Sequence, residues 1–301
     1  RADHLLEGDL SQDEAIVGVI GGSGLYGMDG LTDTEWRRIE SPFGQPSDEL
    51  LFGRLGETQM VFLPRHGRGH RLGPSGINYR ANIDALKRAG CTDIISVSAC
   101  GSFREELPPG CFVIVDQFID RTFAREKSFF GNGMVAHVSM ADPVCSRLGD
   151  ALEAAAKESG IFHVRGGTYL TMEGPQFSTR AESFLYRDWG CSVIGMTNMP
   201  EAKLAREAEI CYATVAMVTD FDCWHEDHAH VDVEAVLKVL HDNAEKAQKL
   251  VAATAPRLAG RRAACAAGCD RALEVALITA PESRDPDVIA NLDAVAGRVL
   301  R

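Results

Sequence analysis

The sequence predicts an α/β protein: a single domain with a central mixed β-sheet flanked by helices. Short runs rich in β-branched residues alternate with amphipathic segments of about ten to fifteen residues, which is the pattern of βαβ units. A length of 301 residues allows one large α/β domain, and 45% apolar with 25% charged residues is typical of a protein with a substantial core. No internal repeat interrupts this pattern, so one domain is preferred over two.

Each expected element follows from its local composition: β-branched apolar runs predict strands, and amphipathic stretches predict helices. The expected strands are residues 16–20, 60–63, 94–99, 112–115, 193–196 and 212–219. The expected helices are residues 78–88, 145–158, 178–188, 199–209, 231–250 and 286–299. The chain then divides into an N-terminal extension (1–15), the α/β domain (16–258) and a C-terminal arm (259–301) that packs on the domain, with the Ala/Arg-rich segment LAGRRAACAAGCDRA as connector.

Composition excludes several classes of partner. A formal net charge of −12 disfavours a nucleic-acid backbone, so any phosphate site must be local. No apolar stretch is long enough for a membrane span, and the first fifteen residues lack the pattern of a signal peptide, which favours a cytoplasmic protein with no membrane partner. Nine scattered cysteines, mostly in apolar segments, suit reduced core thiols better than disulfides. The Cys265/Cys269 pair could chelate or cross-link, but this interpretation is less favoured.

A glycine-rich segment, GGSGLYG, follows the first expected strand. Gly22, Gly24 and Gly27 fit a dinucleotide-binding pattern, but no second apolar strand ending in an acidic residue follows about twenty positions on. The loop can instead offer backbone N–H groups and the Ser23 hydroxyl to a single phosphate, or it can be a purely structural turn. We favour a turn that contacts phosphate.

Two further expected strands lead into residues suited to an anion. Arg65 and His66 directly follow a strand in PRHGRGH, and arginine matches phosphate oxygens with a two-pronged set of donors. The basic residues after them suit a solvated loop, so ligand contact is favoured for these two alone. In the next strand, Ser98 and Ala99 lead into Gly101, where small residues either let the backbone approach a ligand or pack in the core.

Phe177 is a candidate for contact with a planar base. It follows a Gly-Pro turn and precedes Ser178, the expected N-cap of a helix, with Glu182 shortly after it. A ring that projects from this loop can stack on a base, although an isolated phenylalanine more often belongs to a core.

The strongest chemistry lies in TDFDCWHEDHAH, after a buried strand. One residue separates Asp220 from Asp222, so both carboxylates leave an extended segment on one side. A protonated carboxyl can supply the proton that a departing purine needs at N7, and an ionised one accepts a hydrogen bond from a 6-amino group but not from a 6-oxo group. The alternative is a pair that merely caps the loop. A polar loop, rather than a metal site, is expected of the residues that follow: His225, His228, His230 and Asp232.

Nine ordered motifs carry a family resemblance: GVIGGSGL, SPFGQPSD, RHGRGH, INYRANIDALK, ACGSFREE, DQFIDRT, MEGPQFSTRAES, GMTNMPEAKLARE and TDFDCWHE. Through them, residues 16–254 resemble the methylthioadenosine phosphorylases of the trimeric nucleoside phosphorylase superfamily. The resemblance implies the nucleoside phosphorylase fold. It implies a phosphate site of Ser23, Arg65, His66, Ser98, Ala99 and Thr197. It also implies a substrate site of Phe177, Ser178, Met196, Val233, Val236 and Leu237, with His137 from a neighbouring subunit and Asp220 and Asp222 as catalytic, adenine-reading residues.

The reaction that the resemblance implies is phosphorolysis of 5′-methylthioadenosine to adenine and 5-methylthioribose 1-phosphate, a step of methionine and purine salvage, in a cytoplasmic homotrimer. Inorganic phosphate is the co-substrate, and no metal or organic cofactor is expected. The alternative within the superfamily is a 6-oxopurine nucleoside or 5′-methylthioinosine phosphorylase; a nucleoside-binding protein without catalysis and an NAD-dependent dehydrogenase are alternatives from other classes. Gly195 stands where some members have an amide, and a tail residue near Leu277 or Ile278 that would close the pocket is not assigned.

Overall fold

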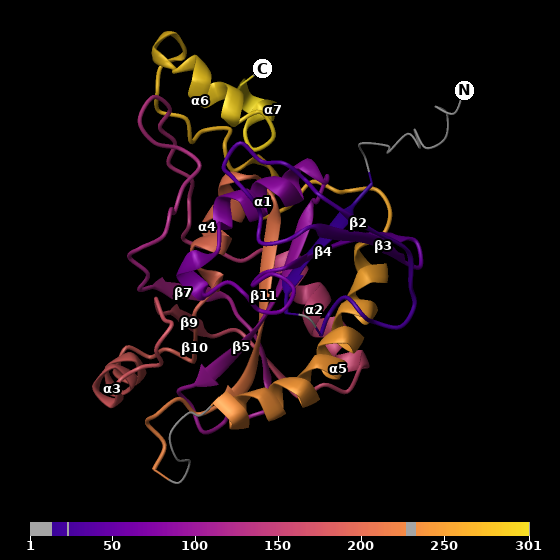
Figure 1. Ribbon diagram of the computed structural model, residues 1–301, viewed down its shortest axis with the longest axis vertical. Helices are drawn as coiled ribbons and strands as arrows, with labels where there is room; N and C mark the ends of the chain where they lie inside the picture. Colours follow the sequence, from indigo (N-terminus) through magenta and orange to yellow (C-terminus); the bar gives the residue numbers. More distant parts are fainter. Residues whose placement is uncertain (1–13, 23, 227–232, 301) are drawn as a thin grey trace.

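Eleven strands form one mixed sheet with helices on both faces, which confirms the predicted α/β class (Figure 1). The computed structural model describes residues 14–22, 24–226 and 233–300. The strands are β1 (Ile16–Gly21), β2 (Leu31–Arg37), β3 (Leu50–Leu55), β4 (Thr58–Pro64), β5 (Asp93–Ser102), β6 (Phe112–Ile114), β7 (Gln117–Asp120), β8 (His163–Arg165), β9 (Thr168–Thr171), β10 (Val193–Gly195) and β11 (Cys211–Asp220). The helices are α1 (Tyr79–Arg88), α2 (Ser146–Glu158), α3 (Arg180–Asp188), α4 (Asn198–Glu207), α5 (Val233–Leu258), α6 (Pro286–Asn291) and α7 (Gly297–Leu300), with short 3₁₀ turns at Pro74–Gly76, Cys269–Arg271 and Pro281–Ser283.

The sheet branches at β5. Its main path runs β2-β3-β4-β1-β5-β10-β9-β7, and β11 leaves the path by pairing with β5 and β6. One edge of β5 pairs with β11 along nearly its whole length, from residue 93 to residue 101. The opposite edge pairs with β1 over residues 93–96 and then with β10 at residues 101–102. Between these two partners, residues 97–100 have no strand partner on that edge among the described residues, which leaves an opening in the sheet at Ser98 and Ala99.

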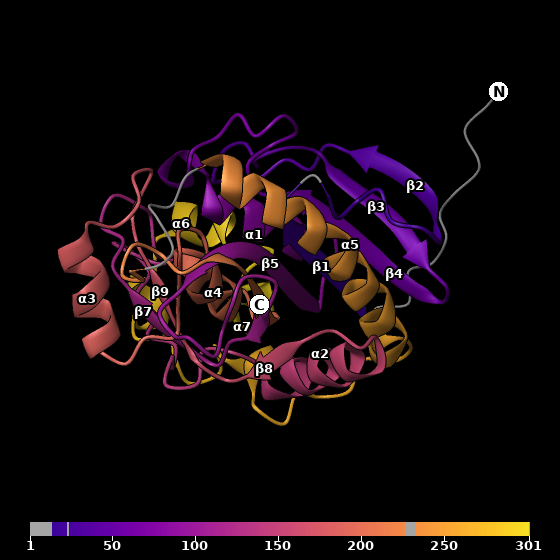
Figure 2. The ribbon, with the colours of Figure 1, turned by 90° about the horizontal axis from the view of Figure 1, so that it is seen from below.

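Two helical layers cover the sheet (Figure 2). α2 and α5 pack against each other and against β11 on one face, and α1 packs against α4 on the other. The strands between them are buried on both sides, as in β1, where Val17 and Val19 belong to one core cluster and Ile16 and Ile20 to another. Continuous apolar runs of this kind are typical of strands that have helices on both faces.

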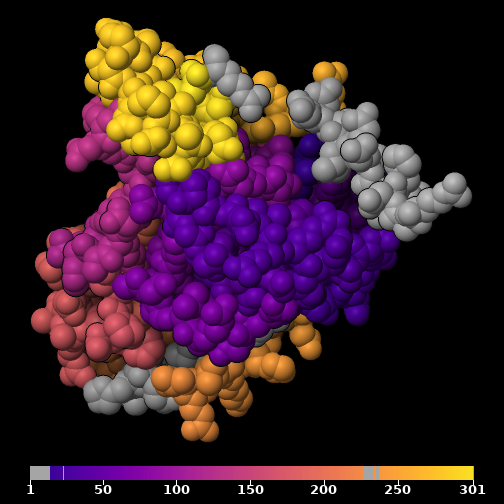
Figure 3. Space-filling model, turned by 45° about the horizontal axis from the view of Figure 1, so that its top comes forward, coloured from indigo at the N-terminus to yellow at the C-terminus, as the bar shows by residue number. Residues whose placement is uncertain are grey.

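Residues 273–296 pack on the layer that contains α1 and α4, and the space-filling view shows the C-terminal residues gathered together in yellow (Figure 3). Leu273, Ala276 and Leu292 join the apolar cluster of that layer, and Arg298 pairs with the buried Glu209 at 2.7 Å. The proposed division into extension, domain and arm stays a prediction, and residues 1–13 lie outside the described part of the chain. Within the described residues, no helix is both long and apolar enough to cross a membrane.

Several expected elements differ from the structure. The expected helix at 286–299 is two short helices, α6 and α7. α5 continues to Leu258 instead of ending at residue 250, and residues 231–232 of its expected start lie outside the described residues. Strands β2, β3, β7, β8 and β9 were not predicted. β2 (LTDTEWR) shows the reason most clearly, because nearly all of its residues are exposed and the sequence therefore lacks the apolar signal of a strand.

Candidate active site

The opening in the sheet gathers the residues predicted to bind an anion. Arg65 directly follows β4, and its N–H bonds the carbonyl of Gly21 at the end of β1 at 3.0 Å. Ser98 and Ala99 lie in β5 at the opening itself. Thr197 precedes α4 as its N-cap, and its side chain makes no capping hydrogen bond. The start of α4, which is interrupted by non-helical angles at Met199, thus meets several strand ends at one place, as in the ligand sites of α/β sheets. Ser23 of the glycine loop lies outside the described residues.

The Arg65 side chain makes more hydrogen bonds to the protein than the sequence indicates. Its side chain is 2% exposed, and its Nε and Nη2 donate to the two carboxylate oxygens of Glu201 at 2.8 and 3.1 Å. Nη2 also donates to Ser96 Oγ at 2.6 Å, and Nη1 donates to the carbonyl of Val97 at 3.0 Å. Glu201 holds the pKa of the Arg65 guanidinium above its ordinary value in spite of burial. One hydrogen of Nη1 has no partner among the described residues, so the guanidinium keeps one N–H that protein atoms do not use.

A buried polar network supports this arginine. Glu201 accepts two further hydrogen bonds, from Ser96 Oγ at 2.6 Å and from the Tyr212 hydroxyl at 2.8 Å. Asn198 donates to the same Tyr212 hydroxyl at 2.8 Å and accepts from Ser98 Oγ at 3.1 Å. Sequence reasoning missed Glu201, Asn198, Ser96 and Tyr212, because each reads locally as an ordinary helix or strand residue. Their position fixes Arg65 and Ser98 before any ligand arrives, which is how a binding site is preorganised.

His66 is held as a neutral ring. Its Nδ1 lies 2.9 Å from the carbonyl of Leu72, which can only accept, so Nδ1 carries the proton and Nε2 is an acceptor. Burial is the main cause that lowers the pKa of His66 to about 4, and the charge of Arg65 adds to it. The ring stacks on His70 at a centroid distance of 4.2 Å. At neutral pH this residue therefore offers a phosphate a hydrogen-bond acceptor rather than a positive charge.

Asp220 and Asp222 lie together at the end of β11. Asp220 accepts hydrogen bonds from Thr219 Oγ1 at 2.7 Å and from the N–H of Asp222 at 2.8 Å. Burial raises the pKa of Asp220, and burial together with the charge of Asp220 raises the pKa of Asp222. The expected extended geometry is wrong beyond Asp220, because Asp222 has a φ of +53°. A tight turn, in which the first carboxylate accepts from the backbone of the second residue, brings the pair together instead.

Glycine at position 101 lets this carboxylate pair approach β5. A Cβ on Gly101 would meet Asp220 Oδ1 at 2.9 Å and Asp222 Cβ at 3.4 Å. The sequence singled out Gly101 as a place of close approach, and the structure shows that the approaching group is the aspartate pair. Because Gly101 follows Ser98 and Ala99 by two to three residues, the carboxylates lie close to the sheet opening.

Met196 lies between β10 and α4, on the loop expected to contact ribose. Its sulfur packs on Gly174, where any Cβ would overlap it, and Gly174 has a φ of +67°. Arg125 donates to the carbonyls of Met196 and Met199 at 2.6 Å each, and its Nε pairs with Glu173 at 3.3 Å. Sequence reasoning missed Arg125 and Glu173. Arg125 holds the backbone at Met196 and Met199, and Glu173 holds Arg125 in place.

Phe177 projects from the loop before α3 and is 43% exposed, as expected of a ring available for stacking. Ser178 is not the N-cap of α3, which corrects the sequence-based expectation. Thr179 is the cap: its hydroxyl accepts from the N–H of Glu182, whose carboxylate accepts in return from the Thr179 N–H. A capping box needs the glutamate three residues after the cap, and Glu182 has that spacing only from Thr179. The Ser178 hydroxyl instead donates to the sulfur of Met172 at 3.7 Å, and it lowers the pKa of Asp222, a smaller effect than burial.

The residues expected around the methylthio group are only partly described. Val233 and Leu237, in the first turns of α5, are 62% and 57% exposed in the single chain. The side chain of Val236 lies outside the described residues, as do His228, His230 and Asp232. His225 lies 3.5 Å from the carboxylate of Glu105.

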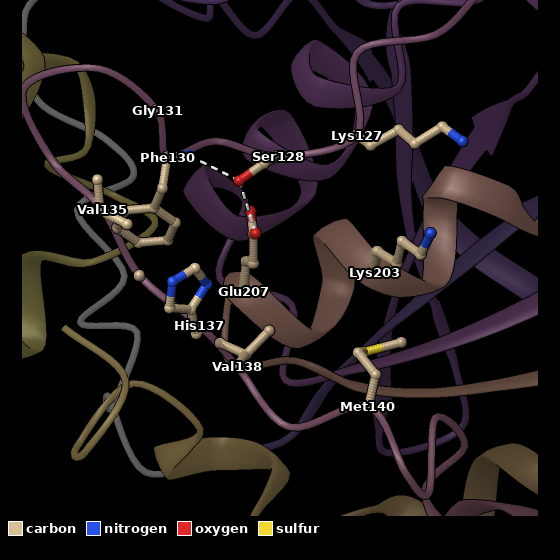
Figure 4. A pocket seen from close by; sticks show the side chains of 11 residues that line it. Lys127, Ser128, Phe130, Gly131, Val135, His137, Val138, Met140, Lys203 and Glu207 are labelled. Carbon is tan, nitrogen blue, oxygen red and sulfur yellow. Dashed lines mark hydrogen bonds between the residues drawn. The ribbon is translucent and has the colours of Figure 1, made fainter. Parts of the chain in front are cut away.

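His137 does not join the other predicted site residues of its own chain. It lines a hollow of about 410 Å³ between the 127–140 loop and α4 (Figure 4). Glu207 and Lys203 of α4 line the same hollow, and Glu207 accepts from Ser128 Oγ at 2.7 Å. Burial raises the pKa of Glu207 to about 7. None of the predicted phosphate-binding or base-reading residues lines this hollow.

Gly195 occupies a position that Tyr169 closes to any side chain. A Cβ built on Gly195 would overlap the Tyr169 hydroxyl, and Tyr169 is fully buried. An amide at this position would therefore require a different residue at 169. The departure at Gly195 thus has a steric explanation in this chain.

We expect Gly195→Ala to lower the free energy of unfolding by about 2 kcal/mol, because the added methyl must displace a packed tyrosine. Denaturant unfolding measures this. Gly73→Ala is the matched control, since Gly73 has a φ of −72° and its Cβ would meet nothing within 4 Å. Equal stability of the two variants would contradict the steric explanation.

Comparison with known protein families shows the class of enzyme to which this chain belongs. Residues 16–256 match the family model of the Phosphorylase superfamily, which covers the whole sheet and the candidate site. An S-methyl-5′-thioadenosine phosphorylase from Rhodospirillum rubrum is 65% identical over 287 residues, which are 95% of this chain and 98% of the relative. The chain belongs to the S-methyl-5′-thioadenosine phosphorylase family of this superfamily.

Solved structures agree in fold. A methylthioadenosine phosphorylase from an antarctic soil metagenomic library has a TM-score of 0.87 and 46% identity, covering 94% of this chain and 99% of its own. A methylthioadenosine phosphorylase from Schistosoma mansoni in complex with adenine has a TM-score of 0.76 and 35% identity, covering 94% of this chain and 98% of its own. The predicted family and fold are confirmed.

Proposed function

We propose that this enzyme cleaves 5′-methylthioadenosine with inorganic phosphate to give adenine and 5-methylthioribose 1-phosphate, as its relatives' names state for them. The observation that carries the proposal is the Asp220/Asp222 pair, with Asp222 buried and Asp220 partly buried, beside a sheet opening with Arg65, Ser98 and Thr197 around it. Two carboxyls with raised pKa values suit an acid for a departing base. An opening with N–H and hydroxyl donors suits an anion.

In the proposed mechanism, the sugar-to-base bond breaks and its electron pair moves to the purine. Asp220 supplies the proton that the purine takes up at N7, and a phosphate oxygen forms the new bond at the sugar carbon from the opposite face. Charge develops on the sugar as an oxocarbenium-like centre, which the negative phosphate stabilises. The Asp220/Asp222 pair accepts from the 6-amino group, and Phe177 stacks on the base. Phosphate and carboxyl supply nucleophile and acid, so we propose that no metal or organic cofactor takes part in the reaction.

The direct test is an assay of base release with and without orthophosphate, using methylthioadenosine, adenosine and 5′-methylthioinosine as substrates. We expect adenine release from methylthioadenosine that requires phosphate. Faster hypoxanthine release from 5′-methylthioinosine would favour the 6-oxopurine alternative, and no base release with any substrate would leave a nucleoside-binding protein. Cleavage that proceeds equally without phosphate would contradict phosphorolysis.

We further propose a homotrimer in which His137 of each chain completes the site of a neighbour. Support comes from its place in the hollow of Figure 4, which none of the predicted phosphate-binding or base-reading residues of the same chain lines. Val275 and Phe123, which are 94% and 82% exposed in the single chain, give apolar surface to an interface. Nine cysteines without disulfides among the described residues suit a reducing compartment, which supports a cytoplasmic place in methionine and purine salvage.

Mixed trimers test the shared site. Two variants are expected to be inactive or nearly so, His137→Ala and Asp220→Asn, and each supplies what the other lacks. In a one-to-one mixture refolded together, we expect about one quarter of the wild-type activity, because a site needs an intact Asp220 from one chain and an intact His137 from the next. Activity no higher than that of the separate variants would place His137 in the site of its own chain, and full activity of His137→Ala by itself would place it outside the site.

A further inference from the structure

Four of the nine cysteines meet inside the protein. Cys145 is the N-cap of α2, Cys211 begins β11, and Cys265 and Cys269 belong to the segment after α5. All four are buried, and their sulfur atoms lie within 4.8 Å of one another. Cys145 Sγ and Cys265 Sγ are 3.7 Å apart. Residues from three distant parts of the chain thus converge on one point.

The spacing of the sulfurs matches a single tetrahedral metal ion. Zinc binds thiolates at about 2.3 Å, so two sulfurs of a tetrahedral site lie about 3.8 Å apart. Cys265 and Cys269 are separated by three residues, within the C-x₂₋₄-C spacing of structural zinc sites. The Gly268 N–H bonds the carbonyl of Cys265 at 2.9 Å, and Gly268 has a φ of +71°. This turn brings the two cysteines to the same side.

The surroundings suit a site of net negative charge. Cys145 lies at the positive end of α2. The Arg147 guanidinium lies beside the Cys211 thiol and pairs with Asp93. Four cysteine ligands would complete a tetrahedral structural zinc site, which has no open coordination position for a substrate.

We propose that Cys145, Cys211, Cys265 and Cys269 bind one zinc ion, which fastens the C-terminal segment to α2 and β11. On binding, the four thiols release their protons to solvent and the thiolate sulfurs coordinate the ion. The ion takes no part in the chemistry at Asp220. The sequence alone favoured reduced thiols. Cys211 and Cys145 lie 54 and 120 positions before Cys265 (265 − 211 and 265 − 145), so their approach to it is not visible along the chain.

The first experiment measures metal and thiols in the full-length protein, expressed in zinc-supplemented medium and purified without chelator. We expect elemental analysis by mass spectrometry to find about one zinc ion per chain. Under denaturation with chelator, all nine cysteines should react with a thiol reagent. Zinc far below one per chain with nine free thiols would show packed reduced cysteines instead. A mass deficit of two hydrogens per bond would show disulfides, and stoichiometric iron would show an iron centre; each of these results would overturn the proposal.

The second experiment compares two cysteine variants. We expect Cys269→Ser to lose its zinc and to lower Tm by on the order of 10 °C, because the binding free energy of a structural metal adds to folding stability. Cys91→Ser is the matched control, since Cys91 is equally buried but lies outside the cluster. It should keep its zinc. Should Cys269→Ser fail to fold, the metal and thiol content of the wild type still decides the matter; equal zinc in both variants would count against the site.

Discussion

Asp220→Asn is expected to lower kcat/KM for phosphorolysis of methylthioadenosine by about 10³-fold, because an amide cannot supply a proton to the departing base. The carboxylate accepts from Thr219 and from the backbone of Asp222 on separate oxygens, at 2.7 and 2.8 Å, and the variant keeps one oxygen for one of these two donors. The amide nitrogen adds a donor. We therefore expect the ratio of 5′-methylthioinosine to methylthioadenosine cleavage to rise as well, since a donor suits a 6-oxo purine.

The pH dependence of the wild type separates loss of an acid from loss of a contact. Burial raises the pKa of Asp220 above the 3.8 of a free aspartate, so the protonated form persists to higher pH. As pH rises through that raised pKa, kcat/KM should fall along an alkaline limb, and this limb should be absent in Asp220→Asn. A limb that survives in the variant would assign the proton to another group.

Stability provides the control for folding. A carboxyl with a raised folded-state pKa contributes stability below its unfolded pKa, and this contribution is lost as pH rises through the folded value. Above that window the wild type holds a partly buried charge that Asp220→Asn lacks. At pH 8 the variant should therefore unfold at a Tm no lower than that of the wild type. An unchanged substrate preference in a well-folded variant would count against Asp220 as a base-reading residue.

The core strands could be predicted because each one contains its own run of apolar residues. β1 and β11 are runs of buried apolar residues, and a run of this kind identifies itself without knowledge of its neighbours. β2 does not, since its pairing with β3, rather than its own side chains, makes it a strand. The Asp220/Asp222 pair was found by composition, yet its geometry was wrong, because spacing along the chain does not reveal the positive φ of Asp222.

Sequence signals could not locate the partners of Arg65. Its bidentate partner Glu201 is 136 positions away. In the sequence, Glu201 resembles any charged residue in the first turn of a helix. Arg65 was therefore expected to offer phosphate a two-pronged set of donors, whereas most of its donors bind protein atoms. Large separations along the chain also hid the convergence of the four cysteines.

The Arg65–Glu201 pair leads to the largest expected effect on stability. Both side chains are 2% exposed, so Glu201→Ala leaves a buried guanidinium without its counter-charge. Loss of one partner of a buried pair costs about 3–5 kcal/mol, which is a large part of the stability of an ordinary domain. Ser96 and Tyr212 also lose the acceptor to which both donate. We expect a decrease in Tm on the order of 10 °C and a loss of phosphate affinity, as measured by thermal unfolding and by KM for phosphate.

Two further variants separate charge from packing at this pair. Glu201→Gln keeps the shape and one acceptor oxygen, so its loss of stability shows what the charge contributes. Arg65→Met with Glu201→Leu removes both charges and fills the space with apolar groups, and replacements of this kind are often neutral or stabilising. We expect the double variant to recover most of the Tm lost in Glu201→Ala but none of the phosphate affinity, because the one N–H of Arg65 that protein atoms do not use is gone. Recovery of both would mean that the pair serves folding alone and that phosphate is held by Ser98, Thr197 and the glycine loop.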